Sequence, residues 1–272
     1  MRTQRSDRGR TLAARADKHE LYEQAVQETS ADIRLIRRAF RRRNDREPES
    51  LREDFCGTAK LCADWVQRQP RRTAVGLDLD AETLAWGRKR HLAPLGAAQS
   101  RVVLLHRDVM QGTGRRFDVV AAFNFSYWIL QTRAELCRYF SAARAELVGD
   151  GLFVLDIYGG PEAQRGLVEQ RRLSGFTYVW EQGPVDAVSH RCQRTIHFRF
   201  KDGSRMRRAF VYDWRLWSLP EVIDALRDAG FAEVDVHWES ADARGRGTGV
   251  FRTVTSVENE DAWVAYLCAW KS

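Results

Sequence analysis

The spacing of apolar residues predicts an alternation of strands and helices from about residue 48 onward. Runs of residues that we interpret as strands occur at residues 51–55, 73–79, 101–106, 117–124 and 152–157, and all but the first are largely apolar. Segments with apolar residues at helical spacing lie between these runs, such as the one that carries Leu136, Tyr139, Phe140, Ala143 and Leu147. Strands that alternate with helices form a parallel sheet through right-handed crossovers. Residues 48–160 are therefore predicted to form an α/β core.

The first 47 residues show a different pattern. Residues 1–16 are polar and rich in arginine, and we expect them to form a disordered basic arm. Residues 17–47 are expected to form two helices, the second of them capped by Ser30. The apolar face of this second helix would carry Ile33, Ile36 and Phe40, and its other face carries arginines 34, 38, 41, 42 and 43.

The alternation ends after Gly159-Gly160. Residues 176–180, 195–200 and 206–214 alternate with period two, and a hairpin turn separates the last two runs. This pattern predicts an antiparallel β insertion over residues 161–217. Residues 218–272 are expected to complete the core with a helix that begins at Ser218 and with strands at 231–238 and 263–270, joined by a long polar loop from Glu239 to Asp261.

Composition narrows the class of protein. The chain has 272 residues, of which 44% are hydrophobic, so it can bury a large core. It contains no apolar run long enough to span a membrane and no apolar segment typical of a signal peptide. Its five cysteines are scattered and form no CxxC pair, which favours reduced thiols, a cytoplasmic location and the absence of a metal site. The net charge of +7 is compatible with an anionic partner but indicates one only weakly.

The stretch Leu-Arg-Glu-Asp-Phe-Cys-Gly-Thr at residues 51–58 places three charged residues in a predicted central strand. Such strands are normally apolar throughout, because helices cover both faces of the sheet. A buried carboxylate is unfavourable unless it is paired or hydrogen-bonded. In one interpretation, a carboxylate at the end of this strand accepts hydrogen bonds from a ligand. In the other, Arg52 forms an internal ion pair with Glu53 or Asp54.

Acidic residues also lie at the ends of the next two strands, at Asp78 and Asp108. Ligands of open parallel sheets bind beyond the carboxyl ends of the strands. Asp78 follows Gly57 by 21 residues, a spacing that suits an acid binding the two hydroxyls of a ribose. A dinucleotide would require a Gly-x-Gly-x-x-Gly loop, whereas only Gly57 is present here. A carboxylate in the first strand suits a cationic ligand, which favours S-adenosylmethionine over a pyrophosphate.

These segments resemble the motifs of the class I S-adenosylmethionine-dependent methyltransferases, of the type that acts on small molecules. Glu53 falls on the acid of the family's first motif, and Phe55, Gly57 and Ala59 fall on its three glycines, so the motif is degenerate. The segment from Gly76 to Leu79 is similar to the second motif. The resemblance implies a Rossmann-like sheet of seven strands, the last antiparallel, with the antiparallel insertion as a lid. It implies S-adenosylmethionine as cofactor, bound by Glu53, Phe55, Cys56, Gly57, Thr58, Asp78, Leu79, Asp108, Val109 and Asn124.

The implied reaction is methyl transfer to a nitrogen or oxygen of a small molecule. Because the methyl group of the donor is already activated, the protein mainly supplies proximity, orientation and exclusion of water. Asp156 and Tyr158 are the candidate catalytic residues, and Tyr22, Tyr127 and Arg215 are candidates for contact with the substrate.

Other functions remain open at this point. One is an RNA or protein methyltransferase that docks its substrate on the basic helix Arg34–Arg43. Another is a non-catalytic S-adenosylmethionine-binding protein, and a nicotinamide oxidoreductase is more distant. No metal and no membrane partner are expected. The sequence pattern assigns neither the methyl acceptor nor the oligomeric state.

Overall fold

A computed structural model describes residues 10–242 and 247–272, which divide into two compact units. The smaller unit consists of residues 10–27 and Gln164–Leu216, and the larger one of Glu28–Ala163 and Trp217–Ser272. Each unit is described by itself. None of the helices in the described ranges is long and apolar enough to cross a membrane.

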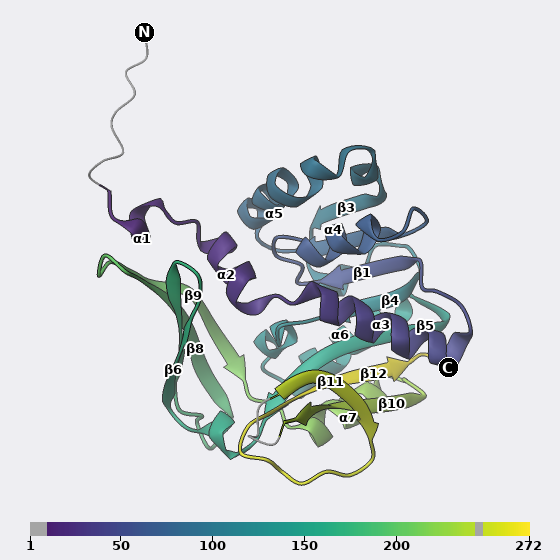
Figure 1. The fold of residues 1–272 in the computed structure, drawn as a ribbon. Coiled ribbons are helices and arrows are strands. Elements are labelled where there is room, and N and C mark those ends of the chain that lie inside the picture. Colours follow the sequence, from purple (N-terminus) through teal and green to yellow (C-terminus); the bar gives the residue numbers. More distant parts are fainter. Residues whose placement is uncertain (1–9, 243–246) are drawn as a thin grey trace. The chain divides into compact units, whose positions relative to one another are not determined.

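The larger unit is built on one sheet with the strand order β11-β10-β12-β5-β4-β1-β2-β3 (Figure 1). Its strands are β1 (Ser50–Asp54), β2 (Thr73–Asp78), β3 (Val102–His106), β4 (Phe117–Ala122), β5 (Leu147–Gly159), β10 (Glu233–Ala241), β11 (Gly247–Val254) and β12 (Trp263–Trp270). Strands β1 to β5 pair in parallel, and β12 is antiparallel to both of its neighbours, β5 and β10. The predicted Rossmann-like sheet with an antiparallel last strand is thus confirmed, and the strand order reverses between β1 and β4.

The predicted count of seven strands was wrong, because this sheet has eight. The additional strand, β11, lies within the segment that was expected to be a polar loop, and it pairs antiparallel with β10 at the edge of the sheet. Its sequence begins Gly-Thr-Gly and most of its side chains are exposed, so it lacks the apolar alternation of a core strand. Phe251 anchors it by packing on Tyr266, with ring centroids 4.7 Å apart. Residues 243–246 of the expected loop lie outside the described residues.

Helices cover both faces of this sheet. They are α3 (Thr29–Asn44), α4 (Lys60–Gln67), α5 (Ala81–Gly87), α6 (Arg133–Ala145) and α7 (Leu219–Asp228). Ser218 forms the predicted capping box at the start of α7. The predicted cap of α3 was wrong: the helix begins at Thr29, and the hydroxyl of Ser30 accepts a hydrogen bond from Arg68 instead (2.8 Å). The N-cap is instead Glu28, whose side chain makes no capping hydrogen bond, so this helix start lacks the Ser, Thr, Asp or Asn cap on which the prediction relied.

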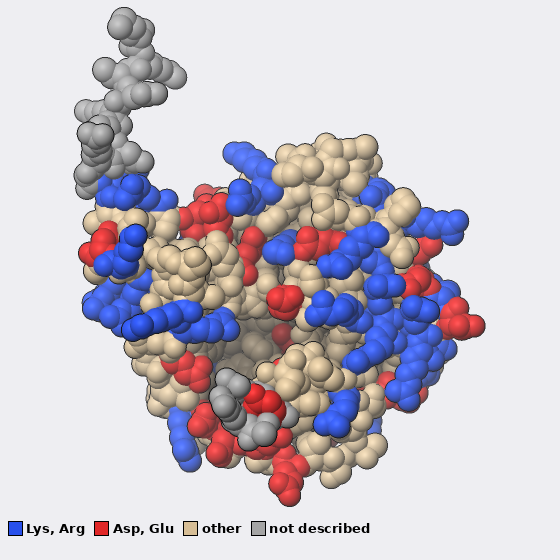
Figure 2. Space-filling model, in the orientation of Figure 1, with Lys and Arg blue, Asp and Glu red and all other residues tan. Residues whose placement is uncertain are grey.

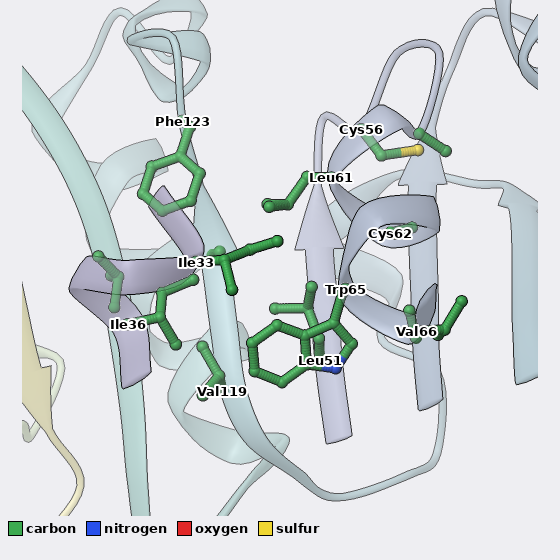
Figure 3. Close-up of a cluster of buried hydrophobic side chains, with 14 of the residues drawn as sticks. Ile33, Ile36, Leu51, Cys56, Leu61, Cys62, Trp65, Val66, Val119 and Phe123 are labelled. Carbon is green, nitrogen blue, oxygen red and sulfur yellow. The ribbon is translucent and has the colours of Figure 1, made fainter. Parts of the chain in front are cut away.

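Alternation along the strands divides the core between the two faces. On one face, Leu51 of β1 and Val119 of β4 pack with Ile33 and Ile36 of α3 and with Trp65 of α4 (Figure 3). On the other face, the Phe153 ring of β5 lies 5.7 Å from each of the Phe140 and Phe231 rings. Because successive side chains of a strand point to opposite faces, Arg52 and Asp54 belong to the second face and Glu53 to the first.

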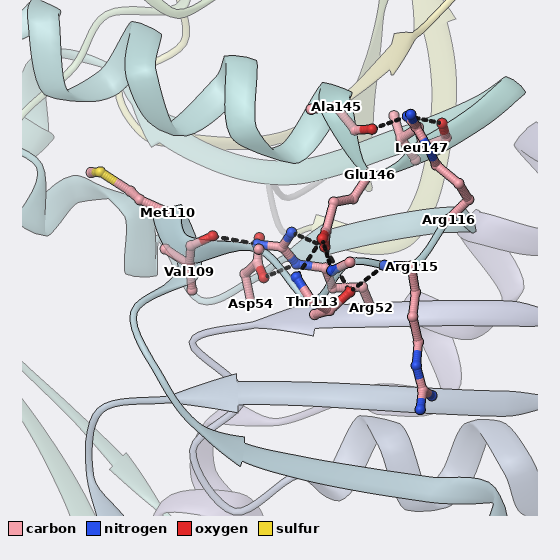
Figure 4. A network of polar contacts seen from close by, with 12 residues as sticks. Arg52, Asp54, Val109, Met110, Thr113, Arg115, Arg116, Ala145, Glu146 and Leu147 are labelled. Carbon is pink, nitrogen blue, oxygen red and sulfur yellow. Dashed lines mark hydrogen bonds and ion pairs between the residues drawn. The ribbon is translucent and has the colours of Figure 1, made fainter.

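Arg52 lies at the centre of a buried polar network on the second face (Figure 4). Its guanidinium binds the Asp54 carboxylate at 2.7 Å and the Glu146 carboxylate at 2.6 Å, and it also donates to the carbonyl of Val109. The Tyr139 hydroxyl donates to the second oxygen of Asp54 (2.9 Å). Burial raises the pKa of Asp54, and the charge of Arg52 opposes that shift. The internal ion pair considered for this strand therefore exists between Arg52 and Asp54, while Glu53 points away from it.

The smaller unit contains a four-stranded antiparallel sheet in the order β6-β7-β8-β9. Its strands are β6 (Leu167–Arg172), β7 (Phe176–Gln182), β8 (Arg191–Phe200) and β9 (Arg205–Arg215). The helix α2 (Lys18–Val26) covers the apolar face of this sheet by packing Leu21 and Ala25 against Phe176, Ile196 and Phe198. The role of this sheet as a lid stays a prediction.

Two expectations for the smaller unit need correction. Three strands were expected, and β6 was missed because its Glu-Gln-Arg-Arg end is exposed and lacks apolar alternation. Residues 1–9 of the expected disordered arm lie outside the described residues, but Leu12–Arg15 within it form the short helix α1, capped by Thr11. The backbone N–H of Leu12 donates to the side chain of Asp202 in the β8–β9 turn, which holds this segment on the sheet.

Replacing Arg52 tests the buried network. Arg52→Met leaves the carboxylates of Asp54 and Glu146 without their cation, and removing one partner of a buried pair costs about 3–5 kcal/mol. We expect a loss of unfolding free energy of that size in urea denaturation. Arg133→Met removes a surface pair with Asp228 and should leave the midpoint unchanged. Equal effects of the two substitutions would contradict a central role for Arg52.

Candidate functional site

The loop between β1 and α4 has an alternating left-handed backbone. Phe55, Gly57 and Ala59 have φ values of 54°, 51° and 57°. These are the three positions at which the first motif of the resembled family has glycine. A residue with a Cβ atom costs about 1–2 kcal/mol in this conformation. The loop thus adopts the backbone shape that glycines would favour, although two of the three glycines are absent.

Contacts with the neighbouring strand β2 hold this loop. The N–H of Cys56 donates to the carbonyl of Leu77 (2.9 Å), and the N–H of Gly57 donates to a carboxylate oxygen of Asp78 (2.7 Å). Gly76 gives Cys56 room, because a Cβ atom on Gly76 would lie 2.8 Å from the Cys56 sulfur. The carbonyl of Thr58 approaches α5 so closely that a Cβ atom on Gly87 would lie 2.2 Å from it. The strained loop is therefore imposed by tertiary contacts.

The acids at the ends of β2 and β3 organise the turns that follow them. The second carboxylate oxygen of Asp78 accepts a hydrogen bond from the N–H of Asp80 (2.9 Å), and Leu79 between them is 63% exposed. Asp108 accepts from the N–H of Met110 (2.8 Å), while Val109 is buried. Glu53, Asp78 and Asp108 thus lie along the carboxyl edge of adjacent strands, as the sequence predicted.

Asp156 holds a second left-handed segment, directly after β4. Its two carboxylate oxygens accept hydrogen bonds from the N–H groups of Asn124 and Phe125, both at 2.8 Å. These two residues have φ values of 57° and 56°. Burial raises the pKa of Asp156 to about 7, and the two hydrogen bonds oppose that rise. Asp156 therefore fixes the backbone at the carboxyl end of β4, next to the point where the strand order reverses.

Glu53 and Asp32 add two more carboxyl groups to this edge. Glu53 is buried and accepts one backbone hydrogen bond, from Cys62 of α4 (3.1 Å); burial raises its pKa to about 8. Asp32, in the first turn of α3, is half-buried and accepts a hydrogen bond from the Tyr266 hydroxyl (2.7 Å). Burial raises the pKa of Asp32 to about 6.

The three carboxyl groups with raised pKa values, those of Asp32, Glu53 and Asp156, influence one another. The charge of Asp32 contributes to the raised pKa values of both Glu53 and Asp156. Carboxylates that raise one another's pKa repel, and a nearby positive charge relieves the repulsion. The carboxyl edge of the sheet is therefore electrostatically suited to a cationic ligand.

The remaining candidates from the sequence are more dispersed. Tyr158, at the end of β5, stacks on Trp128 with ring centroids 4.6 Å apart. Tyr127 is completely buried and packs on Phe140, which places its hydroxyl away from any open surface. Tyr22 and Arg215 belong to the smaller unit, on α2 and β9.

Sequence reasoning missed Asp32 and Tyr266. Asp32 lies four residues before Ile36, on the flank of the apolar stripe of α3, where an acid is a signal that can be found. Tyr266 lies in a predicted strand and carried no signal of its own. Among the described residues, no group of His, Cys, Asp and Glu side chains is arranged to hold a metal ion.

The arginines of α3 form a basic face (Figure 2). Arginines 34, 37, 38, 41 and 42 line, with Asp45, a groove of about 410 Å³. Part of this face is neutralised, because Arg37 binds both carboxylate oxygens of Glu47 at 2.8 and 2.9 Å. Arg43 pairs with Glu233. These pairs attach α3 to its surroundings, as charged residues on a solvated helix face commonly do.

Comparison with known proteins gives structural likenesses only. No protein-family model and no curated protein matches the sequence. An S-adenosylmethionine-dependent methyltransferase from Clostridium acetobutylicum superposes with a TM-score of 0.68 at 17% identity, over 92% of this chain and 96% of that one. CalS10 is an amino pentose methyltransferase from Micromonospora echinaspora, solved with S-adenosylmethionine bound. It superposes with a TM-score of 0.63 at 19% identity, over 91% of this chain and 95% of that one. KedS8, a sugar N-methyltransferase from Streptoalloteichus, superposes with a TM-score of 0.60 at 20% identity, over 92% of each chain. At such identities, these likenesses establish a shared fold.

A pair of glycine substitutions tests the left-handed loop. Ala59→Gly relieves the strain at a left-handed position, so we expect a gain in unfolding free energy of about 0.5–1 kcal/mol after the greater entropy of the unfolded chain is subtracted. Ala63→Gly, in the middle of α4, should cost about 1 kcal/mol. Urea denaturation measures both. A loss at residue 59 as large as that at residue 63 would contradict the left-handed conformation.

Proposed function

We propose that the chain is an S-adenosylmethionine-dependent methyltransferase that acts on a small molecule. The observation that carries this proposal is the left-handed loop from Phe55 to Ala59, fastened to Asp78 beside a group of buried carboxyls. When bound, S-adenosylmethionine supplies an activated methyl group on a positively charged sulfur. The acidic carboxyl edge is complementary to that charge.

The residues at this edge fit the cofactor. A Cβ atom placed on Gly57 would meet only Thr83, at 4.0 Å, so the loop leaves an open approach to its backbone. Each oxygen of Asp78 accepts one backbone hydrogen bond and has capacity for another, as ribose hydroxyls require. The exposed Leu79 offers an apolar surface for the adenine, with Asp108 beside it, and Glu53 suits the amino group. A pyrophosphate would instead face these carboxyl groups, which disfavours a dinucleotide.

We assign Asp156 a positioning role within this site. Both of its oxygens accept hydrogen bonds from the backbone after β4, so its carboxylate holds Asn124 and Phe125 in place. Tyr158 contributes a ring that stacks beside the same segment. Direct participation of these two residues in catalysis stays a prediction.

A small polar acceptor, such as a sugar, is the substrate class that we favour. Two proteins with the same fold are CalS10, an amino pentose methyltransferase, and KedS8, a sugar N-methyltransferase. Docking of RNA or protein on α3 has less support, because Glu47 and Glu233 already neutralise part of its basic face.

Substitution of Asp78 tests the cofactor site. Asp78→Ala removes the acceptor for the ribose hydroxyls and for the N–H of Gly57, and hydrogen bonds to charged groups contribute about 1.5–3 kcal/mol each. We expect the affinity for S-adenosylhomocysteine to fall at least about 100-fold, measured by calorimetric titration. The neighbouring Asp80→Asn retains its helix cap and should bind nearly as the wild type does. Unchanged binding by Asp78→Ala would move the cofactor elsewhere.

Methyl transfer itself tests the function. The protein is incubated with labelled S-adenosylmethionine and an extract of host-cell molecules, which is then separated into small molecules, protein and RNA. We expect the label in the small-molecule fraction, and none there with Asp78→Ala. Label in RNA would instead identify the basic face of α3 as a docking surface. The absence of transfer to any fraction, together with normal binding of S-adenosylhomocysteine, would indicate a non-catalytic binding protein.

A further inference from the structure

The hydrogen bond between Asp32 and Tyr266 has no role in holding the cofactor as described above. Tyr266 lies on β12 directly opposite Asp156 of β5, and its hydroxyl donates to one oxygen of Asp32 on α3. Its ring packs edge-on against Phe123, the residue that follows β4, with centroids 5.7 Å apart. The pair therefore joins α3 to the strands next to the point where the strand order reverses.

We propose that Asp32, oriented by Tyr266, binds the amino group of the methyl acceptor and takes a proton from it, which makes amines the substrate class. This proposal rests on the proposed methyl transfer and specifies its acceptor. Asp32 would contact the substrate directly, and Tyr266 would be a positioning residue.

The geometry leaves Asp32 available for this contact. Tyr266 engages Oδ1, and Oδ2 has no hydrogen-bond partner among the residues that the structure describes. The side chain is half-buried, in contrast to the buried Glu53 and Asp156. A carboxylate with one oxygen held and the other open presents a fixed acceptor toward a ligand. An ammonium group provides the matching donors and the opposite charge.

The charges around Asp32 favour a cation at this position. The ionisable groups that influence Asp32 or the Tyr266 beside it come from several elements: Glu28 just before α3, Arg34 of α3, Lys60 of α4, Asp156 of β5 and Glu239 of β10. Glu53 of β1 is coupled to Asp32 as well. Lys60 is already bound to Asp64 at 2.7 Å. Acidic side chains therefore outnumber basic ones here, and the amino group of an acceptor would favour the ionised forms of these acids, whose pKa values burial raises.

The proton transfer is simple. An N–H bond of the acceptor's ammonium group breaks, its electron pair stays on nitrogen, and the proton forms an O–H bond with Oδ2 of Asp32. The nitrogen then has the lone pair that methylation requires. An aspartate with a pKa of about 6 is ionised at neutral pH and accepts a proton more readily than an ordinary aspartate.

Three variants separate this role from a structural one. Asp32→Asn keeps the size of the side chain and an acceptor for Tyr266 but removes the charge. Tyr266→Phe removes the hydrogen bond that lowers the pKa of Asp32. Asp45→Asn is the matched control, because it makes the same change at the other end of α3. Residue 45 has a left-handed backbone conformation, which Asn adopts as readily as Asp.

The readouts are calorimetric titration with S-adenosylhomocysteine and the rate of label transfer to the small-molecule fraction between pH 5 and 9. Asp32→Asn should transfer at least 10-fold more slowly and bind S-adenosylhomocysteine within about 3-fold of the wild type. The wild-type rate should fall at acidic pH as Asp32 becomes protonated. Asp32→Asn should not show this fall, because the amide does not titrate. Tyr266→Phe should shift that fall to higher pH, because the pKa of Asp32 rises without the hydrogen bond. Asp45→Asn should resemble the wild type, and the labelled product should be a methylated amine.

Several outcomes would overturn the proposal. Equal losses of transfer and of S-adenosylhomocysteine binding in Asp32→Asn would assign Asp32 to the cofactor. Unchanged transfer in this variant, or a labelled ether in place of an amine, would exclude the role outright. If the wild type transfers no label, both the proposed function and this inference fail. That result needs no variant, so it is distinct from the results with Asp32→Asn, which test this inference alone.

Discussion

The burial of charge at the end of β1 is the constraint on which the rest of this structure depends. Strand alternation sends Arg52 and Asp54 to one face of the sheet and Glu53 to the other. On the first of these faces every charge has a partner, because Arg52 lies between the carboxylates of Asp54 and Glu146. On the opposite face, Glu53 accepts a backbone hydrogen bond from Cys62 and is also hydrogen-bonded to the side chain of that residue. The same three-residue run thus supplies an ion pair on one face of the sheet and a buried acid held by Cys62 on the other.

The buried network around Arg52 connects the strands that carry the candidate site. Glu146, which follows α6, accepts hydrogen bonds from Arg52 and from the backbone of Thr113 and Gly114 in the segment before β4. Although burial acts to raise the pKa of Glu146, these hydrogen bonds and the charge of Arg52 lower it overall. Arg52 also binds the carbonyl of Val109, one residue after Asp108. The network therefore joins β1, the end of β3 and the approach to β4, the strands whose carboxyl ends form the candidate site.

The parts of this fold that could be predicted from sequence are those set by local pattern. The parallel strands, their order of appearance and the acids at Glu53, Asp78 and Asp108 follow from apolar runs and from residue spacing. The strands β6 and β11 could not be predicted, because edge strands with exposed side chains do not show apolar alternation. The acid at Asp32 beside the apolar stripe of α3 is visible in the sequence, but its hydrogen bond to Tyr266 is not, because that partner is 234 residues away in the chain.

The conformation of the first loop shows most clearly why sequence was insufficient. Motif comparison associates the left-handed positions with glycine, yet Phe55 and Ala59 adopt that conformation without it. Backbone strain of this kind persists only where the surroundings impose it. Here Asp78 accepts a hydrogen bond from the N–H of Gly57, and the absence of a side chain on Gly76 leaves room for Cys56. Asp156 does the same for Asn124 and Phe125.

The carboxyl groups at this edge therefore divide into two kinds. Asp78 and Asp156 use their oxygens to hold strained backbone, and their negative charge is partly satisfied by peptide N–H groups. Glu53 accepts one backbone hydrogen bond and Asp32 is held by the Tyr266 hydroxyl, and burial raises the pKa values of both. A bound cation would favour the ionised forms of these two acids, which lie on different elements, β1 and α3. Under the proposed function, that separation matches two positive groups, one on the donor and one on the acceptor.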